Sequence, residues 1–159
     1  MTSPADLEAI IAETTAVIEL DPDNAEAWFK RGNAHSNRGE YVQAKTDMER
    51  VVELEPANAM AHNNLGVANL CLGNFGDAVD NTSRAIQIDQ EYRDAYHNRG
   101  LAHSEVGDLE SALSDFNMAI ELDSEYWPAY RHRSVVNHLL GNSDASYQDF
   151  LRARELEAG

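Results

Sequence analysis

Small and apolar residues recur along the chain at a fixed step of 34 residues. One set of equivalent positions holds Gly32, Gly66, Gly100 and Ser134. Others hold Gly39, Gly73, Gly107 and Gly141, or Ala44, Ala78, Ala112 and Ser146. An apolar set holds Leu54, Ile88, Leu122 and Leu156. Several sets keep this step without an insertion, so the pattern predicts a repeat architecture in which each unit is one supersecondary element.

Each unit predicts two helices joined by a short turn. Between Ala27 and Arg38 small and apolar residues recur at helical spacing, and Gly39 then tolerates a left-handed backbone that ends the helix. A second amphipathic segment over residues 40–55 has its apolar residues three and four positions apart. Pro56 cannot continue that helix. Gln90 and Ser124 replace this proline in the next two units, so we expect those helix ends to be less sharply fixed.

Residues 4–20 have the spacing of a second helix that lacks a first helix of its own. Ser3 as N-cap and Pro4 at the first helical position form a good start signal. Ile10 stands where Ala44 stands one period later, and a bulky side chain there would crowd a first helix from the same unit. We therefore interpret residues 1–24 as an N-terminal capping helix, a half repeat. The alternative is that the chain is a fragment of a longer array.

The motif that opens the first unit, Trp28-x-x-Arg31-Gly32, is followed by Ala44 in the second helix and Pro56 at its end. This combination resembles the tetratricopeptide repeat. The resemblance implies an all-α fold, a right-handed superhelical solenoid of antiparallel helix pairs. It divides the chain into four units, residues 25–58, 59–92, 93–126 and 127–159, that form one continuous domain with the capping helix.

Charge is the unusual bulk property of the chain. Twelve basic and 28 acidic residues give a net charge of −16 over 159 residues. Such a surface repels phosphate backbones and anionic lipids, so we expect no nucleic-acid or membrane partner and favour a basic protein segment. Solubility or a salt-rich habitat would also explain the charge. The absence of a secretory signal and the single cysteine are typical of a cytoplasmic protein.

No residue pattern indicates catalysis, a metal or a cofactor. The sequence contains no phosphate-binding loop, dinucleotide-binding motif or nucleophile elbow. The six histidines have no ligand spacing on one helix face, and His35 and His103 are expected to be core histidines with hydrogen-bond partners. Cys71 has no flanking base and is expected to be a buried or half-buried structural thiol. We therefore expect a protein that is not an enzyme.

The resemblance also implies that the first helices of stacked units line a concave groove. Helical phase selects the predicted groove residues: Phe29, Lys30, Asn33, Asn63, Asn64, Val67, His97, Asn98, Leu101, Arg131, His132 and Val135. The amides of Asn64 and Asn98 could satisfy the backbone of an extended peptide, although asparagine can also be merely frequent there. Family members that clamp a chaperone's C-terminal carboxylate use basic residues where Phe29, Asp94 and Asn98 stand here, which disfavours that ligand.

The sequence is consistent with two functions. The first is a protein-interaction scaffold or adaptor that binds an extended peptide in the groove. The second is self-association through the solenoid ends, because the last helix carries an apolar set without a following helix: Tyr147, Phe150, Leu151 and Leu156.

Overall fold

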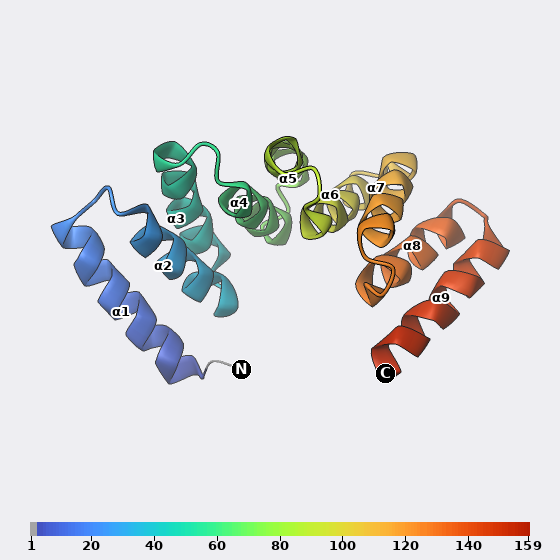
Figure 1. The fold of residues 1–159 in the computed structure, drawn as a ribbon, viewed down its shortest axis with the longest axis horizontal. Helices are drawn as coiled ribbons and strands as arrows, with labels where there is room; N and C mark the ends of the chain where they lie inside the picture. The colour runs from blue at the N-terminus through green and yellow to red at the C-terminus, as the bar shows by residue number, and fades with distance from the viewer. Residues whose placement is uncertain (1–2) are drawn as a thin grey trace. The chain divides into compact units, whose positions relative to one another are not determined.

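The computed structural model describes residues 3–159, and all the regular structure in that range is helical. The helices are α1 (Pro4–Leu20), α2 (Ala25–Asn37), α3 (Tyr41–Leu54), α4 (Ala59–Cys71), α5 (Phe75–Ile88), α6 (Arg93–Glu105), α7 (Leu109–Leu122), α8 (Trp127–Leu139) and α9 (Ser143–Ala158) (Figure 1). The all-α helical repeat fold expected from the sequence is confirmed. The helices α2, α4, α6 and α8 begin 34 residues apart.

Local signals fix the ends of the helices. Ser3 and Asp6 form a capping box at the start of α1, as the N-cap prediction requires. The glycine after each first helix has a positive φ, between 76° at Gly39 and 82° at Gly141, which side chains other than glycine rarely adopt. These turns reverse the chain, so each first helix packs against the second helix that follows it.

The helices that lack a closing proline end at the same repeat position as α3, contrary to the expectation of looser ends. The turns after these helices contain an aspartate whose side chain takes the place of the proline in ending the helix. The Asp89 carboxylate accepts from the backbone N–H of Glu91 at 3.0 Å, and Asp123 does the same for Glu125 at 3.0 Å. An aspartate turn of this kind ends a helix without proline.

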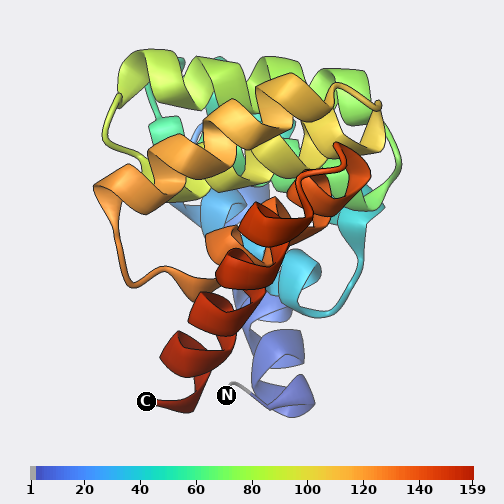
Figure 2. The same cartoon turned by 90° about the vertical axis from the view of Figure 1, so that its right-hand side faces the viewer.

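The chain divides into two compact units, each larger than one 34-residue repeat. The first unit ends at Ile88 and the second unit runs from Asp89 to Gly159. In the first unit α2 packs against α3 and α4 against α5, and α3 also packs against α4. In the second unit α6 packs against α7, α7 against α8, and α8 against α9. Figure 2 shows α9, drawn in red, running along α8 to the C-terminus.

The core of the first unit is a cluster of Met48, Val51, Ala61 and Leu65. Close approach of the helices depends on glycine. A Cβ added at Gly32 would lie 2.7 Å from Cε of Met48, and one at Gly66 would lie 2.6 Å from Cγ2 of Thr82. Packing between paired helices therefore requires glycine at these two positions.

The core of the second unit is built around Phe116, which is completely buried together with Ala112 and Val136. A Cβ at Gly100 would lie 2.8 Å from Cε1 of this ring. The aromatic ring thus fills the space that the glycine leaves, in the position that Met48 occupies in the first unit.

Buried ion pairs that sequence reasoning missed join three of the helix pairs. Each is a two-bond contact between an arginine and an aspartate 16 positions later: Arg31–Asp47, Arg99–Asp115 and Arg133–Asp149. The aspartate side chains are only 3–8% exposed. In the α4–α5 pair, Leu65 and Asn81 stand at these positions, so that pair is held without an ion pair of this kind.

Candidate protein-binding surface

In the first unit the predicted asparagines come together where α4 follows α2. Nδ2 of Asn64 donates to Oδ1 of Asn33 at 2.9 Å, and Nδ2 of Asn63 donates to Oδ1 of Asn64 at 3.3 Å. A shallow cavity of about 320 Å³ opens beside this amide chain, with Val67 and Asn37 in its wall. Asn63 itself is only 5% exposed, so Asn33 and Asn64 present the amides to the cavity.

Two other predicted residues of this unit lie elsewhere. Phe29 is half-buried and packs against the core cluster of α3 and α4. Lys30 is exposed and forms an ion pair with Glu26 at 2.6 Å. The Glu26 carboxylate, by its hydrogen bond and its charge, raises the pKa of Lys30. The open polar surface of the first unit is therefore made mainly by the asparagines.

In the second unit the predicted histidines form a buried pair. His97 on α6 is 7% exposed, and its Nε2 lies 3.0 Å from Nδ1 of His132 on α8. Nδ1 of His132 also lies 2.8 Å from the carbonyl oxygen of Pro128. Because a carbonyl only accepts, the proton is on His132 Nδ1 and the nitrogen of His97 accepts. The Phe116 ring stacks on His132 with 5.9 Å between centroids.

Both imidazoles of this pair are held neutral. Burial, and secondly the charge of His132, lower the pKa of His97 from 6.5 to about 4. Burial also lowers the pKa of His132. Protonating His97 would set two N–H donors against each other in an apolar site. These side chains thus stabilise the contact between α6 and α8 at neutral pH.

The remaining predicted residues of the second unit differ in exposure. Leu101 packs against the cluster around Phe116. Arg131 is exposed, and Val135 is 53% exposed on the same helix. Asn98, the residue after His97 on α6, belongs to the second unit. Its repeat equivalent, Asn64, belongs to the first.

The other chemical groups singled out from the sequence are mostly structural. Nδ1 of His35 lies 2.6 Å from a carboxylate oxygen of Glu40, so this histidine has the partner expected for it. Cys71 was predicted to be buried or half-buried, and that prediction is wrong because the thiol is exposed. Cys71 is the last residue of α4, and the equivalent Asn37 and Glu105 are exposed as well.

Within residues 3–159, no three histidine, cysteine, aspartate or glutamate side chains gather as a metal site would require. None of the helices described combines the length and apolar content needed to span a membrane.

Paired helices repeat every 34 residues, with glycine or serine at the contact between partners and glycine at the turn, and this arrangement defines a helical repeat protein. Models of the tetratricopeptide repeat match residues 14–46 and 94–126. The second match coincides with α6 and α7. The chain is therefore a tetratricopeptide-repeat protein, as its resemblance implied.

Solved structures of this fold superpose on the chain. A crystal structure of MamA is 27% identical, covers 97% of this chain and 90% of its own, and has a TM-score of 0.89. YrrB, described as a TPR protein with an unusual peptide-binding site, is 23% identical over 97% of this chain and 79% of its own, with a TM-score of 0.81.

The first TPR domain of RPAP3 was solved with an HSP90 peptide bound to it. It is 24% identical over 76% of this chain and 96% of its own, with a TM-score of 0.73. The likenesses to YrrB and RPAP3 concern the fold. No curated protein matches the chain by sequence.

Proposed function

We propose that the chain is a protein-interaction scaffold whose first helices bind an extended peptide segment of a partner protein. The observation that carries the proposal is the amide pair of Asn33 and Asn64 beside its cavity. An amide offers both a donor and an acceptor, which is what the backbone of an extended peptide needs whatever its sequence. Val67 supplies an apolar wall for a side chain of the ligand.

In this proposal Asn98 has the same role in the second unit, and Arg131 and Val135 add exposed contacts there. The ligand is an internal segment of its protein, and not a C-terminal carboxylate like that of a chaperone tail. Phe29, Asp94 and Asn98 stand where clamping members of the family place cations, and the Phe29 ring is packed against the core. A carboxylate would lack its charge-assisted hydrogen bonds.

The test is affinity capture from a lysate of the source cells, with bound proteins identified by mass spectrometry. The baits are the wild type, Asn64→Ala/Asn98→Ala and a matched control, Gln43→Ala/Gln87→Ala, which removes two amides from second helices. We expect a partner that both wild type and control retain and that the asparagine variant loses. Equal capture by all three baits would exclude the asparagines from binding.

Self-association is a second candidate, favoured by the exposed apolar side chains of α9. Tyr147 is 59% exposed, Phe150 47% and Leu151 41%. Phe150 occupies the repeat position of Phe116, which is completely buried where another helix follows. Light scattering over a hundredfold range of concentration tests this candidate, since a mass that stays at one chain throughout excludes it.

A further inference from the structure

Among the helices of residues 3–159, α1 has no neighbour on one flank. In the first unit α3 packs against two helices, α2 before it and α4 after it, whereas α2 is the one described helix against which α1 packs. Leu7, Thr14 and Ile18 are the buried residues of α1. Ile10 is half-buried and Val17 is 36% exposed. Apolar surface thus remains on the side of α1 where the repeat would place a first helix.

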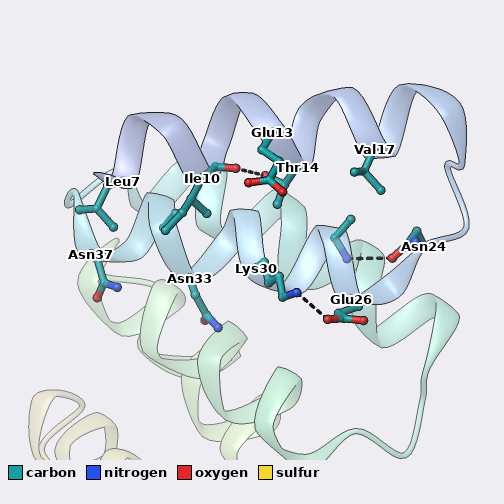
Figure 3. Close-up of a pocket in the computed structure, with 12 residues that line it drawn as sticks. Leu7, Ile10, Glu13, Thr14, Val17, Asn24, Glu26, Lys30, Asn33 and Asn37 are labelled. Carbon is teal, nitrogen blue, oxygen red and sulfur yellow. Dashed lines mark hydrogen bonds and ion pairs between the residues drawn. The ribbon is translucent and has the colours of Figure 1, made fainter. Parts of the chain in front are cut away.

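A cavity of about 510 Å³ lies along this flank, between α1 and α2. Figure 3 shows Ile10, Glu13 and Val17 on α1 and Lys30 and Asn33 on α2 around the same space. The lining residues on α1 run from Leu7 to Val17, which at 1.5 Å per residue corresponds to roughly 15 Å. That is the length of about three helical turns.

The neighbouring helices of the unit show how such a groove is filled. The helix α2 is the first helix of the repeat to which α3 belongs. It packs so close to α3 that a Cβ at Gly32 would lie 3.5 Å from the carbonyl oxygen of Ala44. Ile10 stands at the position of Ala44, and its larger side chain keeps an incoming helix farther from α1. The occupant must therefore fill the groove with bulky apolar side chains, where a repeat helix would use glycine.

The charges around the groove select a basic occupant. Glu13 and Glu26 line it together with one cation, Lys30, which is already paired with Glu26. Residues 3–24 contain six acidic residues and no lysine or arginine. A second copy of the chain fits this field poorly because each copy carries a charge of −16.

We propose that the groove between α1 and α2 binds a short basic amphipathic helix of a partner protein. Its bulky apolar residues, spaced three or four apart, lie on Ile10 and Val17, and its lysine or arginine side chains face Glu13. This is a helix-in-groove contact. The groove shares Asn33 and Asn37 with the cavity of the asparagine surface, but it differs in its α1 wall and in the conformation of its ligand.

The proposal is tested with a synthetic peptide of about three to four turns that carries leucines at helical spacing and lysines along the flanks. Fluorescence anisotropy measures its binding to the whole chain, and a second peptide has glutamate at every lysine position. We expect the lysine peptide to bind and its affinity to fall as salt is added, while the glutamate peptide binds at least about tenfold more weakly.

Variants then locate the site. Val17→Asp and Glu13→Lys should each weaken the lysine peptide about tenfold or more, since they remove an apolar contact and a charge of the groove. Glu8→Lys is the matched control, with the same charge change on an exposed residue of α1 that does not line the cavity. Circular dichroism confirms that each variant remains helical.

Two results would overturn the proposal. Equal loss in Glu8→Lys and Glu13→Lys would show general attraction to an acidic protein without a defined groove. Peptide binding that is absent, together with self-association that Val17→Asp abolishes, would show that a second copy occupies the groove. Asn64 does not itself line the groove, so Asn64→Ala should leave peptide binding there within about twofold and separates a failure of this site from a failure of the asparagine surface.

Discussion

The contact between successive first helices is made with different chemistry in the two units. Between α2 and α4 it is an amide hydrogen bond, from Asn64 to Asn33, at the edge of a shallow cavity. Between α6 and α8 it is the imidazole pair of His97 and His132, and the ring of Phe116 contacts both imidazoles. The repeat thus fixes the backbone arrangement and leaves the contact chemistry free. An amide does not titrate near neutral pH, whereas a buried histidine couples stability to pH.

The largest expected difference between the units is their response to acid. The pKa of His97 is about 4 in the folded chain against 6.5 ordinarily, so the unfolded chain binds more protons between these values. The contribution of His97 to the free energy of unfolding is therefore fully present above about pH 7.5. It decreases as pH falls toward 4, by about 3 kcal/mol. Lowering of the pKa of His132 acts in the same direction.

Each unit contains one tryptophan, Trp28 and Trp127, so fluorescence can follow them separately in Trp127→Phe and Trp28→Phe variants. Denaturant titrations at pH 7.5 and pH 5 should show the loss in the signal of Trp127. His97→Asn/His132→Asn, which replaces both imidazoles by amides that do not titrate, should remove this pH dependence. The histidine pair would lose its assigned role if the double variant kept the full acid sensitivity.

A smaller effect is expected from the buried ion pairs. Asp115→Ala leaves the guanidinium of Arg99 without the two hydrogen bonds of 2.7 and 2.9 Å that it makes to the carboxylate. The free energy of unfolding of the second unit should fall by about 2 kcal/mol, because Arg99 is partly exposed and can turn to water.

The matched change in the first unit is Asn81→Ala, at the equivalent position of α5. Asn81 is half-buried and makes an exposed hydrogen bond, in which it donates to the carbonyl of Asp77 on its own helix. We expect a change within about 0.5 kcal/mol, measured by the same chemical denaturation. Equal losses in the two variants would mean that the ion pair adds nothing to the helix contact.

The smallest effect concerns the asparagine pair. Asn64→Ala removes one amide bond at a partly exposed site, and we expect a loss of about 1 kcal/mol with no change between pH 7.5 and pH 5. Thermal unfolding at the two pH values measures it. A pH-dependent loss would contradict the distinction drawn between the units.

Local features of the fold could be predicted from the sequence because local chemistry determines them. The capping box at Ser3 and the positive φ of Gly39 depend on a few neighbouring residues, and the helix starts follow the repeat. The replacement of Pro56 by aspartate turns at Asp89 and Asp123 was not anticipated, although the aspartates two residues before Glu91 and Glu125 are a readable signal.

The arrangement of side chains between helices was harder to predict. Helical phase places Phe29 and Leu101 on the side of the groove. In the structure both side chains instead pack against core clusters, because the next first helix lies across them. His97 and His132 are 35 positions apart, and their contact depends on how closely α8 approaches α6. The arginine–aspartate pairs had a readable signal, since both partners recur 16 positions apart in three units.

The glycines at the four turns have a consequence for how such a protein changes over evolution. A Cβ at Gly39, Gly73, Gly107 or Gly141 would meet no atom within 4 Å, so only the backbone conformation demands glycine there. Each turn is thus independent of the residues that pack around it. A duplicated gene segment of one period arrives with a working reversal already encoded, and its contact residues can then diverge from asparagine to histidine without disturbing it.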